Sequence, residues 1–236
     1  MKPKIRVPYF EIGFKNYVYG DTLLEYAIAA DKAAEKYDID VLIIAPVVEI
    51  RRIAEHTKHL IILAPHMDPF YPGRGIANIL PEGLKAAGAH GVVVNHCENP
   101  ISIPSMRMIM DRAEELDFLV FACADSIAEA KALAQLHPDI LNPEPSELIG
   151  IANDDVCNAD YIKNTVESIK SIYSDILVEQ AAGIRTGQQV YECIMAGSDA
   201  AGASSGIMTA SDPIAMINEM VAATRKAADE LMKLRQ

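Results

Sequence analysis

The sequence predicts a parallel α/β fold that closes into a (β/α)8 barrel and covers residues 1–236 as one domain. Short apolar runs such as VLIIA, LIILA and FLVFA alternate with amphipathic helical segments. Continuous apolar runs are typical of parallel strands that are buried on both faces. The alternation gives eight strand–helix units, and eight units in a chain of this length fit a closed barrel of about 250 residues.

An open, doubly wound sheet is the main alternative architecture. Its dinucleotide-binding form requires G-x-G-x-x-G after an early strand, and no such motif follows the runs at 9–14 or 41–45. The chain contains no obvious linker, close repeat or low-complexity segment. These observations favour the barrel.

The apolar runs and the segments between them define the expected elements. Asp21, Asn158, Thr186 and the pair Ser211–Asp212 are candidate helix N-caps, and Pro104 is a favourable first helical residue. The expected strands are Tyr9–Phe14, Val41–Ala45, Leu60–Ala64, Gly91–Asn95, Phe118–Cys123, Ile140–Glu144, Asp175–Val178 and Gly202–Ser205. The expected helices are Thr22–Lys36, Val48–Glu55, Pro81–Ala87, Pro104–Leu116, Ile127–Leu136, Ala159–Tyr173, Gly187–Met195 and Pro213–Lys233.

The composition limits the possible partners and location. The net charge is −12 and the pI is about 4.9, which argues against nucleic acid and anionic membranes. The chain has no apolar run of the roughly 20 residues that span a bilayer, and its N-terminus lacks a signal-peptide core. We expect a cytoplasmic protein.

Cysteine and histidine spacing predicts no metal site. Cys97, Cys123, Cys157 and Cys193 form no C-x-x-C pair, and we expect reduced, mostly buried thiols. His56 and His59 have helical i, i+3 spacing, but no carboxylate motif completes a ligand set, so an exposed helix end is the better interpretation.

The side chains that could take part in binding or catalysis lie at the ends of the expected strands. In a barrel the functional site lies where strands end and βα loops begin. Lys15, His96 and Glu144 end the first, fourth and sixth strands, and Pro143 and Pro145 hold Glu144 in stiff, extended backbone. The segments AAGIRTG and ASSG follow the seventh and eighth strands, where barrels often bind phosphate. A cation, an imidazole, a carboxylate and a phosphate site are therefore expected at one face.

Several of these segments resemble a known family in its own order. They are GFKNY, PFYPGRGIANILPEGLKAAGAHG, VVVNHCEN, PEPSELIG, AAGIRTG and GASSGIMTASDP. Nearly end to end, the chain resembles the triosephosphate isomerases, especially their short archaeal form.

The resemblance implies an aldose–ketose isomerase of glycolysis and gluconeogenesis. Such an enzyme interconverts dihydroxyacetone phosphate and glyceraldehyde 3-phosphate through an enediol, without a cofactor or metal. Glu144 would be the base, His96 the neutral electrophile, and Lys15 the cation that stabilises the phosphate and the enediolate. The substrate and phosphate contacts would come from the small-residue loops and the segment after Glu144: Ile149, Gly150, Gly183, Ser204 and Ser205.

The sequence also departs from the family pattern. Gly13 replaces an asparagine two positions before the lysine, so a substrate contact is lost there. Arg185 replaces a loop-seven serine, and it is either a surface charge or a second phosphate contact. Cys97 replaces the serine after the histidine, and we expect it to point away from His96 because neighbouring strand residues face opposite sides. The loop-six tip Gly-Thr-Gly is Gly150-Ile151-Ala152, and the third-loop Thr-Gly pair is Ile76-Ala77.

These departures leave two alternatives beside the triose phosphate reaction. One is the same chemistry on another small sugar phosphate, and the other is a non-catalytic relative that binds phosphorylated ligands. The retained Lys15, His96 and Glu144 favour an enzyme, because binding alone does not require a base. The apolar third loop, where the family's dimer contact lies, predicts a homodimer or homotetramer.

Overall fold

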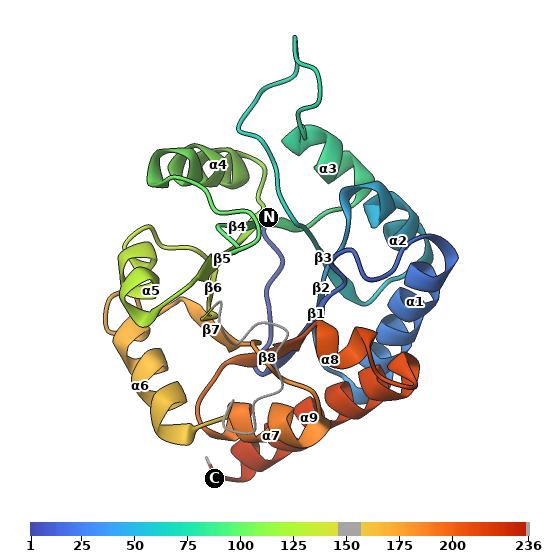
Figure 1. Ribbon diagram of the computed structural model, residues 1–236, viewed down its shortest axis with the longest axis vertical. Helices are drawn as coiled ribbons and strands as arrows, with labels where there is room; N and C mark the ends of the chain where they lie inside the picture. The colour runs from blue at the N-terminus through green and yellow to red at the C-terminus, as the bar shows by residue number, and fades with distance from the viewer. Residues whose placement is uncertain (146–156, 235–236) are drawn as a thin grey trace.

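The computed structural model describes residues 1–145 and 157–234. Eight parallel strands form a closed barrel in which each strand pairs with its neighbour in sequence order, and β8 pairs with β1. Helices surround the barrel (Figure 1). The predicted (β/α)8 fold is therefore confirmed.

The element bounds are as follows. The strands are β1 Tyr9–Gly13, β2 Val41–Ile44, β3 Leu60–Ala64, β4 Gly91–Val94, β5 Leu119–Ala124, β6 Ile140–Pro143, β7 Leu177–Gln180 and β8 Ala200–Ala203. The helices are α1 Gly20–Tyr37, η1 Val47–Glu49 (a 3₁₀ turn), α2 Ile50–His56, α3 Pro81–Ala87, α4 Ile103–Glu115, α5 Ile127–Ala134, α6 Ala159–Lys170, α7 Gly187–Met195, α8 Ser205–Met208 and α9 Pro213–Leu234.

Most predicted elements occur within a residue or two of their expected bounds, but the last two strands are displaced. β7 lies two residues later than expected, and its second half is the polar pair Glu179–Gln180. β8 lies two residues earlier, in the small-residue run Ala200–Ala203. β8 carries no branched apolar side chain, and β7 carries only Leu177 and Val178 before its polar pair, so neither forms the longer branched apolar run that identified most other strands.

The predicted helix caps are confirmed at three sites and wrong at one. The side chains of Asn158, Thr186 and Asp212 accept hydrogen bonds from the first turns of α6, α7 and α9. Asp21 does not cap α1, because that helix begins one residue earlier at Gly20. Asp21 instead pairs with Arg52 of α2.

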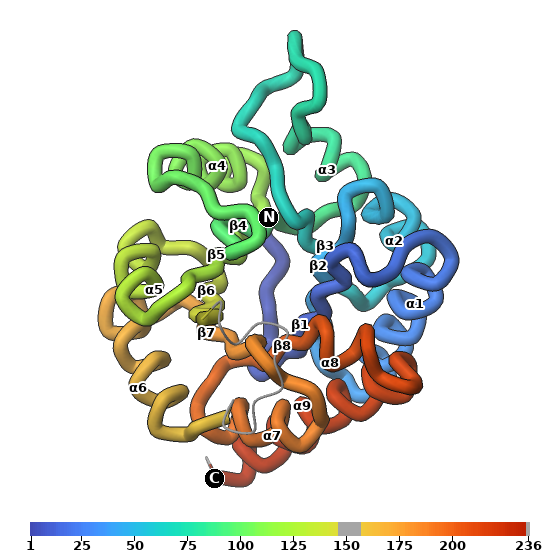
Figure 2. The backbone as a smooth tube through the Cα atoms, viewed as in Figure 1, coloured from blue at the N-terminus to red at the C-terminus, as the bar shows by residue number. Residues whose placement is uncertain are grey.

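The N-terminal segment lies beneath the barrel. In Figure 2 it runs from the N-terminus across the barrel opening to β1, and Ile5 packs against the side chains that fill the barrel interior. Lys2 pairs with Asp139, just before β6, at 3.1 Å. This segment therefore covers the end of the barrel opposite the carboxyl ends of the strands.

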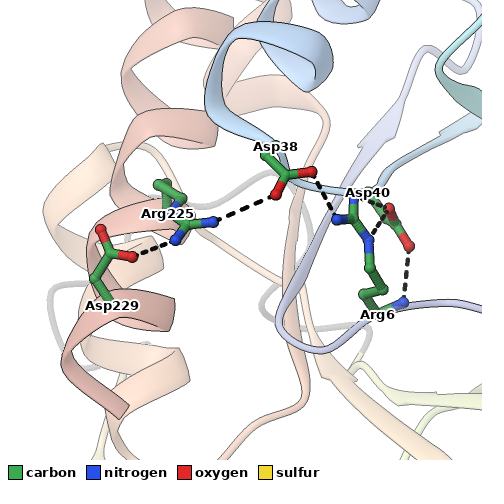
Figure 3. Close-up of polar contacts among 5 residues, drawn as sticks. All are labelled: Arg6, Asp38, Asp40, Arg225 and Asp229. Carbon is green, nitrogen blue, oxygen red and sulfur yellow. Dashed lines mark hydrogen bonds and ion pairs between the residues drawn. The ribbon is translucent and has the colours of Figure 1, made fainter. Parts of the chain in front are cut away.

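A chain of ion pairs joins the N-terminal segment to two helices (Figure 3). Arg6 pairs with Asp38 at 2.7 Å and with Asp40 at 2.6 Å, where α1 leads into β2. Arg225 of α9 also pairs with Asp38, at 3.8 Å. Arg6 and Asp38 are largely exposed, whereas Asp40 is 16% and Arg225 32% exposed. Each pair that includes an exposed partner stabilises the fold only slightly, but together they connect three segments that are distant in sequence.

The cysteine prediction is wrong for one pair. Cys157 and Cys193 form a disulfide with their Cα atoms 5.0 Å apart, whereas Cys97 and Cys123 are free. The bond joins Cys157, two residues before α6, to Cys193 of α7. A separation of 36 residues gives no sequence signal for it, because only the packing of these helices brings the two thiols together.

In residues 1–145 and 157–234, no helix combines the length and apolar character needed to cross a bilayer. No cluster of three or more His, Cys, Asp or Glu side chains in the same ranges is arranged to hold a metal ion. His56 and His59 are exposed, as expected.

A buried arginine holds the long loop between β3 and α3, which we call the third loop (residues 65–80). The side chain of Arg112 on α4 is 5% exposed and pairs with Glu82 of α3 and with Glu115. Its guanidinium stacks 3.8 Å from the centre of the Tyr71 ring, and Nε donates to the carbonyl of Phe70 at 3.4 Å. One side chain therefore fixes the third loop to two helices.

We expect Arg112→Ala to lower the free energy of unfolding by about 2–3 kcal/mol, because it leaves the partly buried Glu82 and the carbonyl of Phe70 without their partner. Denaturant unfolding measures the change. Arg107→Ala on the exposed side of the same helix is the control, with an expected change within about 0.5 kcal/mol. Equal midpoints for the two variants would contradict the anchoring role.

Candidate active site

One cavity of about 400 Å³ opens at the carboxyl ends of the strands. Its size falls in the range of about 300–1,000 Å³ that is typical of small-molecule sites. Seven of the residues predicted from the sequence line it: Gly13, Lys15, His96, Glu144, Gly183, Ser204 and Ser205. The expected convergence on one face is present.

Lys15 lies just beyond β1 in a left-handed backbone conformation, with φ of 47°. This turn directs the side chain over the cavity, where Nζ donates to Oε1 of Glu98 at 3.1 Å. Burial by itself lowers the pKa of Lys15, but the hydrogen bond to Glu98 and the charges of Glu98 and Glu144 raise it on balance. Lys15 is therefore a cation throughout the physiological pH range.

His96 lies beyond β4, and its hydrogen bonds define its tautomer. The backbone N–H of Glu98 donates to Nδ1 at 3.1 Å, so the neutral ring carries its proton on Nε2. Nε2 lies 3.6 Å from Oε2 of Glu144. Burial lowers the pKa of His96, and the charge of Lys15 lowers it further. The ring thus offers a neutral Nε2–H to the cavity.

Glu144 follows the last residue of β6, and its backbone N–H donates to the carbonyl of Ala124 at 2.8 Å. Its side chain is 12% exposed. Burial raises the pKa of Glu144 to about 7, although the charge of Lys15 opposes this shift. A carboxyl with such a pKa exchanges its proton near neutral pH, which suits a general base.

The two small-residue loops reach the cavity as expected, but only in part. Gly183 takes φ of 79°, which favours glycine, and Ser204 and Ser205 follow β8. Arg185 is half-buried beside this rim and is not among the residues that line the cavity. Ile149 and Gly150 lie outside the described residues, and so do Ile151 and Ala152.

The loss of the family asparagine at Gly13 has a steric explanation. Ser204 Oγ donates to the Gly13 carbonyl at 2.7 Å, and a side chain at Gly13 would overlap that hydroxyl. Oε1 of Glu11 lies 3.3 Å from the position that a Gly13 Cβ would occupy. Ser204 and Glu11 therefore fill the space beside Lys15.

Sequence reasoning missed several polar residues that line the cavity: Glu11, Asn16, His66, Glu98, Asn99 and Asn142. Glu11 had a usable signal, because it lies two positions before the predicted site residue Gly13 on the same face of β1. Asn142 likewise lies two positions before Glu144, at the end of β6. Glu98 lies in the loop after β4, where alternation gives no guidance.

The expectation that Cys97 points away from His96 is wrong. Sγ lies 3.9 Å from Nδ1 of His96. Both residues follow the end of β4 at Val94, so the alternation of a strand does not apply to them. Burial raises the pKa of Cys97, as do the charges of Glu144 and Glu98. The thiol therefore stays protonated near neutral pH and is a poor nucleophile.

Comparison with known proteins agrees with this geometry. The triosephosphate isomerase family profile matches residues 12–190. The chain is 31% identical to the triosephosphate isomerase of Sulfolobus acidocaldarius over 98% of its own length and 99% of the relative's. It is 31% identical to that of Sulfurisphaera tokodaii, with 97% and 99% covered. It is 28% identical to that of Methanothermus fervidus, with 91% and 97% covered.

The chain belongs to the triosephosphate isomerase family. Its relatives named here are archaeal and match over nearly their whole length, so the resemblance to the short archaeal form is confirmed. In this family member Lys15, His96 and Glu144 lie together at one rim of the barrel.

The titration of Glu144 tests the electrostatics of this site without any assumption about its function. In the free protein we expect the Glu144 carboxyl to titrate near pH 7, followed by NMR of labelled glutamate carbons. Lys15→Met should raise the pKa of Glu144 further, because it removes the cation that favours the carboxylate. Lys4→Met, remote and exposed, is the control. A Glu144 that titrates near pH 4.5 would refute the burial argument.

Proposed function

We propose that the chain is a triosephosphate isomerase that interconverts dihydroxyacetone phosphate and glyceraldehyde 3-phosphate through an enediol. The observation that carries the proposal is the pairing of a neutral His96 Nε2–H with Glu144 at 3.6 Å, beside the cation of Lys15. An enediol route requires a base at carbon and a proton donor at oxygen, and these two groups supply them.

In the proposed reaction, the ionised Glu144 removes a proton from the carbon next to the carbonyl. His96 Nε2–H donates a hydrogen bond to the carbonyl oxygen and stabilises the charge that develops there. Lys15 stabilises the same charge and the phosphate. His96 then moves the proton of the hydroxyl on the deprotonated carbon to the former carbonyl oxygen. Glu144 returns its proton to the former carbonyl carbon, so the carbonyl is now on the carbon that first lost a proton. No cofactor or metal is required in this scheme.

The phosphate group is assigned to the rim formed by Gly183, Ser204 and Ser205. These residues line the cavity on the β7–β8 side, where backbone N–H groups can hold an anion in an acidic protein. Arg185 lies next to this rim. Its role is either that of a surface charge or that of a second phosphate contact, and the proposal is compatible with both. The same proposal includes a cytoplasmic location and a role in glycolysis and gluconeogenesis. Ile149 and Gly150, which the resemblance implies as substrate contacts, lie outside the described residues.

A second substrate is favoured by one observation. Gly13 has no side chain and Glu11 lies below it, so the surface that meets the substrate differs from the family pattern. The same proton transfer on another small sugar phosphate would use the same three groups. A coupled assay on glyceraldehyde 3-phosphate and on four-carbon sugar phosphates distinguishes the two substrates, and tight binding without turnover would indicate a non-catalytic relative.

Glu144→Gln tests the base. The amide keeps the size of the side chain but accepts no proton, so we expect kcat to fall by about 10²–10⁴. Affinity for inorganic phosphate should change little, because the β7–β8 rim is intact. Lys15→Ala should weaken phosphate binding as well as turnover. Glu55→Gln, on the exposed surface of α2, is the control. Near wild-type turnover in Glu144→Gln would refute the role of Glu144 as the base and with it the isomerase proposal.

The third loop carries a proposal about assembly. Ile76 is 95% exposed, Tyr71 61% and Phe70 48%, and the loop projects from the barrel (Figure 1). We expect a homodimer or homotetramer in which this apolar loop is covered by another copy. Light scattering at micromolar concentration should give at least twice the 25.7 kDa of one chain.

Ile76→Asp should then shift the mass toward the monomer, because it places a charge in the covered apolar contact. Met232→Asp, on the exposed side of α9, is the control and should leave the mass unchanged. A wild type that stays monomeric at micromolar concentration would contradict this assembly.

A further inference from the structure

The floor of the cavity differs in character between its two halves. Inward-facing residues of β2 to β5 are apolar, whereas β6, β7, β8 and β1 contribute a polar sector. That sector comprises Asn142, Glu179, Gly202 and Glu11. Of its three polar side chains, Glu11 and Asn142 line the cavity. They lie below Lys15 and Glu144, so they form the floor of the candidate active site.

Two glycines make room for the Glu11 carboxyl. A methyl group at Gly202, which pairs with Glu11 across β1 and β8, would overlap Oε2 of Glu11 and would lie 2.6 Å from Oε1 of Glu179. The other Glu11 oxygen, Oε1, extends toward the space above Gly13. The carboxyl thus reaches from the Glu179 side of the barrel to the cavity.

Both floor residues have a buried oxygen without a protein partner among the described residues. These are Oε1 of Glu11 and Oδ1 of Asn142, on residues that are 4% and 3% exposed. The Asn142 amide nitrogen already faces Oε2 of Glu144 at 3.5 Å. Since buried polar atoms are normally hydrogen-bonded, the molecule that occupies the cavity is expected to satisfy these two.

The charges around the floor indicate which chemical group fits. Burial raises the pKa of Glu11 well above its usual range, and the charges of Glu179 and Glu144 raise it further. Burial also raises the pKa of Glu179, to about 8. A neutral carboxyl donates and accepts, and an amide oxygen accepts. An anion would be repelled by the charge of ionised Glu144, whereas an uncharged hydroxyl can bond with both floor groups.

We propose that Glu11 and Asn142 form a hydroxyl-binding subsite that selects phosphorylated polyols carrying a hydroxyl on the carbon farthest from the phosphate. The proposal deepens the proposed function and rests on it only for the place of the phosphate, at the opposite, outer end of the cavity. It makes Glu11 a specificity-determining residue that stands in the space left by Gly13.

The test is calorimetric binding of unreactive ligands. The set comprises inorganic phosphate, glycerol 3-phosphate, 2-hydroxypropyl phosphate, which lacks the terminal hydroxyl, and erythritol 4-phosphate. In wild type, the ligands with a terminal hydroxyl should bind about 3- to 10-fold more tightly than 2-hydroxypropyl phosphate, the effect of about one hydrogen bond.

Substitutions at Glu11 separate hydrogen bonding from packing. Glu11→Met keeps the length of the side chain but offers no hydrogen bond, so the preference for the terminal hydroxyl should disappear. Glu11→Gln donates and accepts like the neutral carboxyl, so the preference should survive. Affinity for inorganic phosphate should be the same in both. An apolar replacement of a buried charged group is usually tolerated, and thermal unfolding checks that each variant is folded.

Glu179→Gln is the matched control, because it changes a neighbouring interior carboxyl that does not line the cavity. Its ligand preference should equal that of wild type. The proposal fails if wild type does not discriminate by the terminal hydroxyl, or if Glu11→Met discriminates equally well. The ligand that loses most affinity in Glu11→Met shows whether the subsite serves a three-carbon or a four-carbon chain.

The outcome is independent of turnover. A wild type without isomerase activity that still shows the Glu11-dependent preference supports the subsite and refutes the proposed function. An active isomerase whose ligand preference does not depend on Glu11 refutes the subsite and supports the proposed function.

Discussion

Closure of the parallel barrel is the constraint on which the rest of this structure depends. Because all eight strands run the same way and pair in sequence order, their carboxyl ends meet at one rim. Strand alternation then decides which side chains face inward at each level. Lys15, His96 and Glu144 are distant in sequence and meet only because they follow strands one, four and six. The same closure places Glu11 and Asn142 one level below them.

Much of this arrangement could be predicted from the sequence, for a physical reason. Strands such as VLIIA and LIILA must be buried on both faces, so their composition reveals them. β7 and β8 were misplaced because Glu179 and Gln180 interrupt one and Ala200 to Ala203 provide little side chain for the other. Glu179, which made β7 hard to recognise, belongs to the polar interior sector that also forms the floor of the cavity. Features that depend on three-dimensional packing, such as the Cys157–Cys193 disulfide, correspond to no local pattern in the sequence.

Desolvation links the candidate site to the stability of the barrel. Burial raises the pKa of Glu144 to about 7 and that of Glu179 to about 8. A carboxyl with a raised pKa holds its proton more tightly in the folded state than in the unfolded state. The folded state is therefore favoured relative to the unfolded state at low pH, and this advantage declines as the pH rises from about 4.5 through the folded-state values. Lys15 opposes the shift at Glu144, so the ionised base that the proposed reaction needs is obtained by placing a cation beside a buried acid.

The departures around Gly13 are sterically coupled and are best understood as a set. A side chain at this position would overlap Ser204 Oγ and approach Oε1 of Glu11. Restoring the family asparagine alone would therefore displace the Ser204 hydroxyl from the Gly13 carbonyl, which it bonds at 2.7 Å. The Glu11 carboxyl in turn needs the open space at Gly202. Relative to the family pattern that the resemblance implies, a carboxyl that rises from the floor lies deeper in the barrel than a side chain at Gly13 would. Under the proposed function, such a change alters which ligands fit, while Lys15, His96 and Glu144 keep their places at the rim.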